Sequence, residues 1–359
     1  MVTKATDRIA PRTEALDQCP ICHSKDAKFF LVAPDRLHGV PGEFSYEICN
    51  NCRTVFQNPR VIPEDLFICY PSDYYTHAPE AAPRNISDNN RLSAPSGDSF
   101  RAKLRQSVID AIKGQQRHDL IGVFGKLLSK NRTLRERAFY GVLLDELLPR
   151  QLNHARALEI GCGSGDLLAR LKSVGWCAEG LEWDSEAARL AETNSGCSVR
   201  VGDVRELEDP PGSFDLIVLH HVFEHLPSPI ESLKAVRDLL SPIGKAVLVY
   251  PNPDSLGAKF FKTNWFPWDP PRHLFFAPIS SIHVASHELG FGFSARTSSR
   301  TAEYCSAKSR RYKSGKMDEG YSVTLDRWDF WFKRIELCLI LAGLPLGEEI
   351  FVVLQKGKA

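Results

Sequence analysis

One stretch of this 359-residue chain organises its second half: it reads Leu158-Glu159-Ile160-Gly161-Cys162-Gly163-Ser164-Gly165. The apolar run that ends at Ile160 predicts a short strand, and residues 166–171 begin a pattern of apolar residues at helical spacing. A glycine loop between a strand and a helix turns tightly and lets a ligand approach the backbone. From residue 155 onward, short apolar segments alternate with amphipathic ones, which predicts an α/β fold with a mostly parallel sheet.

Two acidic residues argue against a dinucleotide at this loop. The dinucleotide pattern has a third glycine five residues after Gly161, where this chain has Asp166. Glu159 lies two residues before Gly161, at a position that is usually apolar in dinucleotide sites. These carboxylates would repel a pyrophosphate, whereas they would attract a cationic sulfonium and an amino group. The alternative is a turn that binds no ligand, for which so many glycines would cost chain entropy without a gain.

Further residues follow at the spacing expected for a bound nucleoside. The predicted strand at residues 177–182 ends in Glu182, where a carboxylate can accept hydrogen bonds from both ribose hydroxyls. Trp183 can lie against the adenine ring, or it can simply pack as an aromatic side chain. Asp203 is placed to accept a hydrogen bond from the adenine amino group, although by itself it would be an ordinary turn residue.

These residues resemble the cofactor motifs of class I S-adenosylmethionine-dependent methyltransferases. The resemblance spans residues 147–292 and rests on the glycine loop, on residues 180–182 and 202–203, and on the apolar run 214–219. It implies a Rossmann-like, seven-stranded sheet with one antiparallel strand near its edge and a last strand at residues 349–354. Glu182 stands where Asp is commoner, and this change should preserve ribose binding. The resemblance assigns the cofactor to Glu159, Gly161, Cys162, Gly163, Gly165, Glu182, Trp183, Asp203, Val204 and His220.

Histidines follow the predicted fourth strand. Ligands of open parallel sheets bind outside the carboxyl ends of the strands, and here the chain carries His220, His221 and His225. The pair Glu224-His225 resembles the Glu-His signature of ubiquinone-type O-methyltransferases. A hydroxyl acceptor needs a base that removes its proton, and histidine suits this role near neutral pH. We expect His225 or His221 to be the base, with a purely structural role as the alternative.

The segment after the predicted fifth strand is rich in aromatic, proline and charged residues. Aromatic side chains stack on sugar or ring faces, and a guanidinium binds a carboxylate or a phosphate. We therefore predict an acceptor-binding wall that contains Asn252, Trp268 and Arg272, with His273 as a third candidate base. For each single residue, a loop that packs on the sheet is an equally good explanation.

Two Cys-x-x-Cys pairs lie near the start of the chain, Cys19 with Cys22 and Cys49 with Cys52. Their spacing matches the four-thiolate site of a zinc ribbon, in which no coordination position stays open. We therefore expect a structural Zn²⁺ ion that supplies folding energy to a small unit. A redox role is less favoured, because the pairs are not placed at a strand-to-helix junction.

The predicted ribbon, together with several later residues, resembles a bacterial group of zinc-ribbon methyltransferases. This group is associated with surface-polysaccharide and sugar pathways. This resemblance rests on the cysteines, on residues 58–60 and 74–75, and on residues 270–273. It implies a sugar or polysaccharide acceptor, methylated on oxygen or on carbon. The resulting domain prediction is a zinc-ribbon module at 1–72, a linker and basic helical segment at 73–146, and the methyltransferase domain at 147–359.

Composition sets the remaining expectations. The formal net charge of +1 gives no global reason to expect nucleic acid as a partner. An RNA methyltransferase that binds through the ribbon and the basic helices is therefore an alternative and not the main prediction. Residues 1–8 lack the apolar stretch of a signal peptide, and no apolar run is long enough to span a bilayer, which predicts a cytoplasmic protein. The sequence leaves the oligomeric state open.

A third alternative is a ubiquinone-like small molecule delivered from a membrane. The basic residues of 100–148 and the apolar-aromatic stretch at 328–337 could then rest on a bilayer surface. A solvated basic face and a helix buried against the sheet explain the same residues without a membrane, and this is the expectation we favour.

Overall fold

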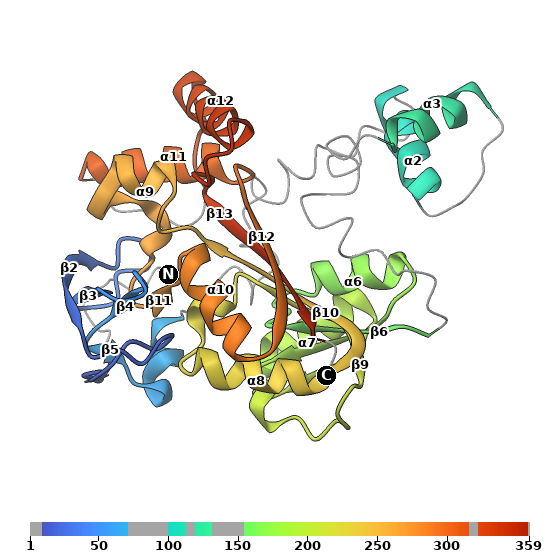
Figure 1. The fold of residues 1–359 in the computed structure, drawn as a ribbon. Helices are drawn as coiled ribbons and strands as arrows, with labels where there is room; N and C mark the ends of the chain where they lie inside the picture. The colour runs from blue at the N-terminus through green and yellow to red at the C-terminus, as the bar shows by residue number, and fades with distance from the viewer. Residues whose placement is uncertain (1–8, 71–99, 113–118, 131–153, 316–321, 358–359) are drawn as a thin grey trace.

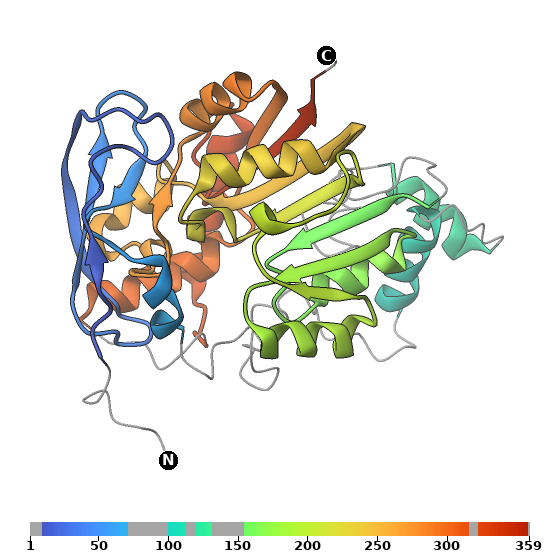
Figure 2. The ribbon, with the colours of Figure 1, turned by 90° about the horizontal axis from the view of Figure 1, so that it is seen from below.

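The computed structural model describes residues 9–70, 100–112, 119–130, 154–315 and 322–357. Figure 1 shows a large central sheet with helices around it, a smaller N-terminal sheet drawn in blue at one end, and a pair of helices at the other end. The view from below shows the same order of the three regions (Figure 2). Tyr74, Tyr75 and residues 131–148 of the predicted basic segment lie outside the described residues.

The central sheet has seven strands in the order β12-β13-β10-β9-β6-β7-β8. Only β13 runs antiparallel to its neighbours, β10 and β12. The prediction of a seven-stranded sheet with one antiparallel strand near its edge is therefore confirmed. The strands are β6 (Arg156–Ile160), β7 (Cys177–Glu182), β8 (Val199–Val201), β9 (Phe214–His220), β10 (Leu240–Pro251), β12 (Phe291–Ser298) and β13 (Glu349–Lys356).

Helices cover both faces of this sheet, which explains why its central strands are continuous apolar runs. In β9, Ile217 and Leu219 belong to the core shared with Leu233 of α8, whereas Leu216 and Val218 face the core that holds the side chain of Leu171 from α6. The covering helices are α6 (Asp166–Ser173), α7 (Ser185–Ser195), α8 (Pro229–Leu239) and α10 (Ile279–Glu288).

The N-terminal sheet is completed by a short strand from the second half of the chain. Its strands β2 (Ala27–Pro34), β3 (Glu43–Cys49) and β4 (Val55–Gln57) are antiparallel, and β11 (Phe275–Phe276) pairs with β4. Phe275 and Phe276 are both buried. The sheet therefore joins residues from two of the predicted domains, 1–72 and 147–359.

Shorter elements connect these regions. The strands β1 (Thr13–Glu14) and β5 (Arg60–Val61) pair with each other, and 3-10 helix η1 (Pro63–Cys69) follows. Around the central sheet lie η2 (Val204–Glu206), η3 (Phe223–His225), α9 (Leu256–Phe261), η4 (Lys262–Asn264), η5 (Phe266–Trp268), α11 (Ala302–Lys313) and α12 (Arg327–Leu341). The pair at the far end consists of α2 (Phe100–Ile112) and α3 (Leu120–Leu128).

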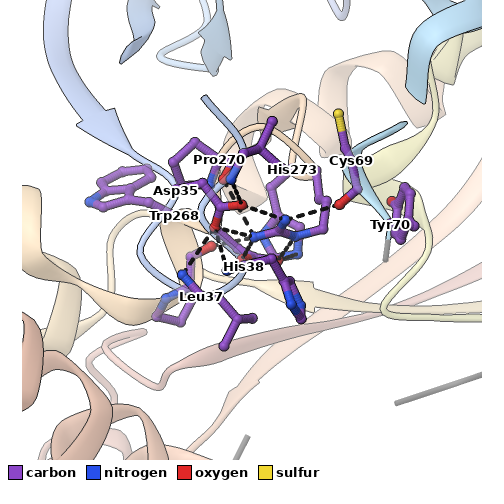
Figure 3. Close-up of polar contacts among 12 residues, drawn as sticks. Asp35, Leu37, His38, Cys69, Tyr70, Trp268, Pro270 and His273 are labelled. Carbon is purple, nitrogen blue, oxygen red and sulfur yellow. Dashed lines mark hydrogen bonds and ion pairs between the residues drawn. The ribbon is translucent and has the colours of Figure 1, made fainter. Parts of the chain in front are cut away.

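A fully buried ion pair joins the N-terminal sheet to the central domain. The guanidinium of Arg272 donates to both carboxylate oxygens of Asp35, at 2.8 and 2.9 Å, and to both oxygens of Asp269, at 2.6 and 3.0 Å. It also donates to the carbonyl of Cys69 at 3.1 Å. The Asp35 carboxylate accepts three further hydrogen bonds, from the amides of Leu37, His38 and Val40. The contacts of this cluster are drawn in Figure 3.

Replacement of Asp35 tests how much this junction stabilises the protein. Asp35→Ala would leave part of a buried guanidinium and several amides without an acceptor, so we expect the free energy of unfolding to fall by about 3–5 kcal/mol. Urea unfolding followed by tryptophan fluorescence measures this change. Asp17→Asn, at an exposed ion pair with Lys25, is the matched control and should shift the free energy by less than about 1 kcal/mol. Equal effects of the two variants would contradict the role assigned to Asp35.

Candidate cofactor and acceptor site

The glycine loop after β6 adopts a backbone that side chains would disturb. Gly161, Gly163 and Gly165 have φ values of +66°, +50° and +82°. A Cβ at Gly161 would lie 2.4 Å from Cγ2 of Val222, and one at Gly165 would lie 2.7 Å from a backbone oxygen of α7. Gly165 is also the N-cap of α6, so no side chain caps this helix. The glycines thus let the loop pack closely against Val222 and α7 at the carboxyl end of β6.

Glu182 is held against this loop at the carboxyl end of β7. Its carboxylate accepts from the amide of Gly163 at 2.9 Å and from the amide of Trp183 at 3.0 Å. The indole of Trp183 is half exposed and lies 5.6 Å from the ring of Tyr70. A bound ribose would meet the oriented carboxylate of Glu182, and a bound adenine would meet the exposed ring of Trp183.

Glu159 is a buried acid without a cationic partner at close range. Its side chain is 4% exposed, and its Oε2 has no hydrogen-bond partner among the described residues. Burial, together with the nearby charge of Glu182, raises the pKa of Glu159 well above its usual range. A bound ammonium or sulfonium group would supply the missing positive charge. A cation bound beside Glu159 would let this carboxyl group ionise, which fits the charges of S-adenosylmethionine and not those of a pyrophosphate.

The two residues expected near the adenine have different surroundings. The carboxylate of Asp203 forms a two-point ion pair with Arg205, at 2.8 and 2.9 Å. Val204 is buried in the core. An adenine amino group would therefore have to share Asp203 with Arg205. Cys162 is a buried thiol in the loop itself, and burial raises the pKa of this thiol, so it packs as a neutral group.

His221 is locked between two buried carboxylates. Its Nδ1 lies 3.4 Å from Glu224 and its Nε2 lies 3.0 Å from Glu349. Burial lowers the pKa of His221, but the hydrogen bonds with Glu224 and Glu349 outweigh it and raise the pKa to about 9. The imidazole is therefore protonated at neutral pH, and both of its nitrogens face carboxylates. His221 is a source of positive charge and not a free base.

Arg300 extends this network to His220. The guanidinium donates to Glu349 at 2.8 Å and to Nε2 of His220 at 3.0 Å. Burial, with His221 and Arg300 nearby, lowers the pKa of His220 well below its usual range. His220 is thus neutral, and its Nε2 lone pair accepts from Arg300. The outcome is a pair of cations, His221 and Arg300, at the carboxyl end of β9.

His225 differs from His221 in its hydrogen-bond partners. Its Nδ1 lies 2.9 Å from the carbonyl of Arg272 and 2.9 Å from the hydroxyl of Tyr70. A carbonyl can only accept, so the tautomer that donates from Nδ1 leaves the lone pair on Nε2. Burial, and secondarily His273, lowers the pKa of His225 to about 4. His225 is therefore unprotonated across the neutral range.

His273 lies beside His225, with 4.6 Å between the ring centres. Its Nδ1 is 2.7 Å from the carbonyl of Pro267, and its Nε2 is 3.9 Å from Glu224. The ligand atoms of Glu224, His225 and His273 lie within 4.8 Å of one another, close enough to share one cation. The structure thus brings the four candidate histidines to the carboxyl ends of β9 and β10. They are His220, His221, His225 and His273.

The three residues predicted to form the acceptor wall are packed inside the protein. Arg272 is fully buried and bound to Asp35 and Asp269. Trp268 is 2% exposed and donates from its indole to the carbonyl of Lys262 at 2.7 Å. The Asn252 side chain donates to the carbonyls of Pro345 and Gly347. The structure therefore places these side chains as packing and bridging groups, which is the alternative explanation given for each.

The sequence patterns did not predict Arg300, Glu349 or Tyr70 as site residues. Arg300 follows β12, so its position after a sheet strand could have marked it. Glu349 begins the antiparallel β13, and an antiparallel strand starts where its parallel neighbours end. Tyr70 follows η1 in the N-terminal region. No local sequence signal links it to His225, which lies 155 residues further along the chain.

The four cysteines of the N-terminal region converge. The Sγ atoms of Cys19 and Cys52 are 3.6 Å apart, as are those of Cys22 and Cys49. All four sulfurs lie within 4.8 Å of one another. Four thiolates around one tetrahedral zinc at about 2.3 Å would have similar separations. The donor set and its geometry fit a closed, structural zinc site.

The pKa of His221 predicts a pH-dependent contribution to stability. Because the folded pKa of about 9 exceeds the unfolded one, the stabilisation is complete below about pH 6.5 and is lost as the pH rises through about 9. His221→Gln should lower the free energy of unfolding by about 2 kcal/mol near pH 6 and by much less near pH 10. Urea unfolding at both pH values tests this, with the exposed His287→Gln as control. A pH-independent loss would disprove the assignment.

Comparison with known proteins points to the same fold. Residues 132–293 match the family model described as a methyltransferase domain. Ubiquinone biosynthesis O-methyltransferase of Xanthomonas euvesicatoria pv. vesicatoria (strain 85-10) is 36% identical over 104 residues, which are 27% of this chain and 44% of that protein. The enzyme of the same name from Burkholderia vietnamiensis is 33% identical over 95 residues, 25% of this chain and 41% of that protein. The chain thus spans less than half the length of these relatives.

Solved structures give weaker similarity. A SAM-dependent methyltransferase from Archaeoglobus fulgidus is 19% identical with a TM-score of 0.42, over 66% of this chain and 100% of that one. A SAM-dependent methyltransferase from Thermotoga maritima, described as a possible histamine N-methyltransferase, is 16% identical with a TM-score of 0.39, over 57% and 84%. The strand order and the family match together show the Rossmann-like fold of class I methyltransferases.

Proposed function

We propose that this protein is an S-adenosylmethionine-dependent methyltransferase that methylates a hydroxyl group of a small-molecule or glycan acceptor. The observation that carries the proposal is the buried side chain of Glu159, whose Oε2 has no hydrogen-bond partner among the described residues, in the strand that leads into the glycine loop, together with the oriented carboxylate of Glu182. The first suits the positive charge of the cofactor's methionine part, and the second suits a ribose. Trp183, half exposed beside them, offers a face to the adenine.

When it is bound, S-adenosylmethionine supplies an electrophilic methyl group. The protein's own contribution is to hold the acceptor oxygen in line and to remove its proton. His225 is the base in this proposal, because its Nε2 carries the lone pair and its Nδ1 is fixed by the Arg272 carbonyl. At the same edge of the sheet, His221 and Arg300 form a charge-balanced network with Glu224 and Glu349, which fixes the segment that carries His225.

The acceptor class rests on weaker support. The relatives that are named ubiquinone biosynthesis O-methyltransferases favour a small molecule with a hydroxyl group over a polymer. A sugar hydroxyl, as the resemblance to the zinc-ribbon group suggests, is the narrower version of the proposal. RNA is disfavoured by the net charge of +1. Transfer of labelled methyl groups to phenols, sugar nucleotides or RNA distinguishes these three classes.

We further propose that Cys19, Cys22, Cys49 and Cys52 bind a structural Zn²⁺ ion. Their sulfurs have the separations of a tetrahedral site, and the amide of Cys52 points to the sulfur of Cys49 at 3.5 Å, as expected around a thiolate ligand. The sheet that contains Cys49 also contains β11, which begins two residues after His273. A zinc ion bound to these cysteines would therefore also stabilise the acceptor side of the site.

Cofactor binding is the first test of the proposed function. Isothermal titration calorimetry should detect binding of S-adenosylmethionine and of its demethylated product. Glu182→Ala removes the ribose acceptor and should weaken both by about 10- to 100-fold. Glu186→Ala, an exposed acid on α7, is the matched control and should bind like the parent protein. An unchanged affinity for Glu182→Ala, or no binding by the folded parent, would refute the cofactor assignment.

Metal content tests the zinc proposal. Elemental mass spectrometry of the purified protein should find about one zinc ion per chain. Cys49→Ser should lower this content and the melting temperature, because metal binding contributes directly to folding. Cys177→Ser, at an exposed thiol outside the cluster, should change neither quantity. Full zinc content in Cys49→Ser would show that the metal, if present, binds elsewhere.

A further inference from the structure

The helix α12 has its polar side inside and its apolar side outside. Trp331 is 59% exposed and Leu341 is 78% exposed, whereas the acids Asp329 and Glu336 are fully buried. A helix on the surface of a water-soluble domain normally shows the opposite pattern. The expectation that this stretch is buried against the sheet is therefore not met. The exposed apolar residues of α12 and the turn after it are Trp328, Phe330, Trp331, Ile335, Leu337, Leu341 and Leu344.

The inward acids fix this orientation. Asp329 accepts hydrogen bonds from Ser306 at 2.9 Å and from Arg310 at 2.9 Å, both on α11. Glu336 accepts from the amide of Glu348 at 2.9 Å, at the start of β13. Rotation of the helix about its axis would break these buried bonds and leave the acids without partners, which is costly. The buried hydrogen bonds of Asp329 and Glu336 therefore hold the apolar face of α12 toward the solvent.

The exposed charged residues within α12 are positive. Arg327 and Arg334 are the exposed charged residues of α12, because its two acids point inward and Lys333 binds Glu303. Arg334 lies over the ring of Trp331, 5.3 Å from its centre. Beside the helix, a shallow cavity of about 380 Å³ is lined by Phe260, Phe261, Trp328, Arg310, Lys313 and Ser314. Of the two cations at this cavity, Arg310 is paired with Asp326 and Asp329, and Lys313 lies over the ring of Phe260, 5.8 Å from its centre.

We propose that α12, with the adjoining Phe260, docks the protein on an anionic lipid bilayer. Tryptophan, phenylalanine and leucine side chains would enter the boundary of headgroups and acyl chains, and the arginines would face lipid phosphates. A second copy of the chain fits less well, because two such faces would bring like charges together. This inference does not depend on the proposed reaction.

The helix would lie in the plane of the membrane surface. Its fifteen residues extend about 22 Å, less than the roughly 30 Å of hydrocarbon in a bilayer. Among the residues that the structure describes, no helix has the length and the apolar character to cross a membrane. Figure 1 shows α12 at the outer edge of the molecule, beyond α11, where a flat surface could reach it.

Vesicle flotation of the full-length protein tests the proposal. We expect binding to phosphatidylcholine vesicles that contain about one quarter phosphatidylglycerol, and much weaker binding to pure phosphatidylcholine. Trp331→Ser and Leu341→Ser should each lower the partition coefficient by about tenfold. Arg327→Glu with Arg334→Glu should lower binding to the anionic vesicles and leave the weak binding to neutral ones unchanged.

Two controls make the result specific. Ile243→Ser changes an equally exposed apolar residue far from α12, and Phe124→Ser changes the exposed apolar face of α3; both should bind like the parent protein. S-adenosylmethionine binding and the melting temperature show whether each variant is folded. Binding to neither type of vesicle, or a loss confined to Phe124→Ser, would overturn the proposal. So would a stable dimer in sedimentation velocity that Trp331→Ser converts to monomer, because a second copy would then cover this face.

Discussion

The ion pair between Arg272 and Asp35 is the constraint around which the rest of the structure is arranged. It is fully buried, so it exists only while the N-terminal sheet and the central domain stay together. The backbone carbonyl of the same Arg272 receives the Nδ1 hydrogen of His225, and β11 begins three residues later. One short segment therefore connects the cysteine cluster, the domain junction and the proposed base.

Local charge, and not net charge, distinguishes the two halves of the site. The cofactor side has the acids Glu159 and Glu182, whereas on the acceptor side the cations His221 and Arg300 lie with the carboxylates of Glu224 and Glu349. A positively charged methyl donor would face acids, and the acceptor would meet a network in which cations and carboxylates balance. The near-neutral composition hides this separation, because the charges cancel when they are only counted.

The sequence predicted the fold well because buried parallel strands are continuous apolar runs and the glycine loop tolerates few alternatives. It predicted the site less well. Arg272 looked like a ligand-binding residue because a sequence does not reveal whether a cation meets a substrate or a buried aspartate. Arg300 and Glu349 were missed because each comes from a segment far from the motifs. The expectation that residues 328–337 are buried against the sheet was wrong, since Asp329 and Glu336 are bound inside and the aromatic residues Trp328, Phe330 and Trp331 face outward.

The pairing of β11 with β4 makes the two ends of the chain interdependent parts of one folding unit. A protein shortened to its methyltransferase domain would present Phe275 and Phe276 on an unpaired strand, and an isolated ribbon would present the bare edge of β4. Such edges recruit other strands and lead to aggregation. The N-terminal region is therefore not an accessory that could be exchanged or lost during evolution without a compensating change in the segment that carries the proposed base.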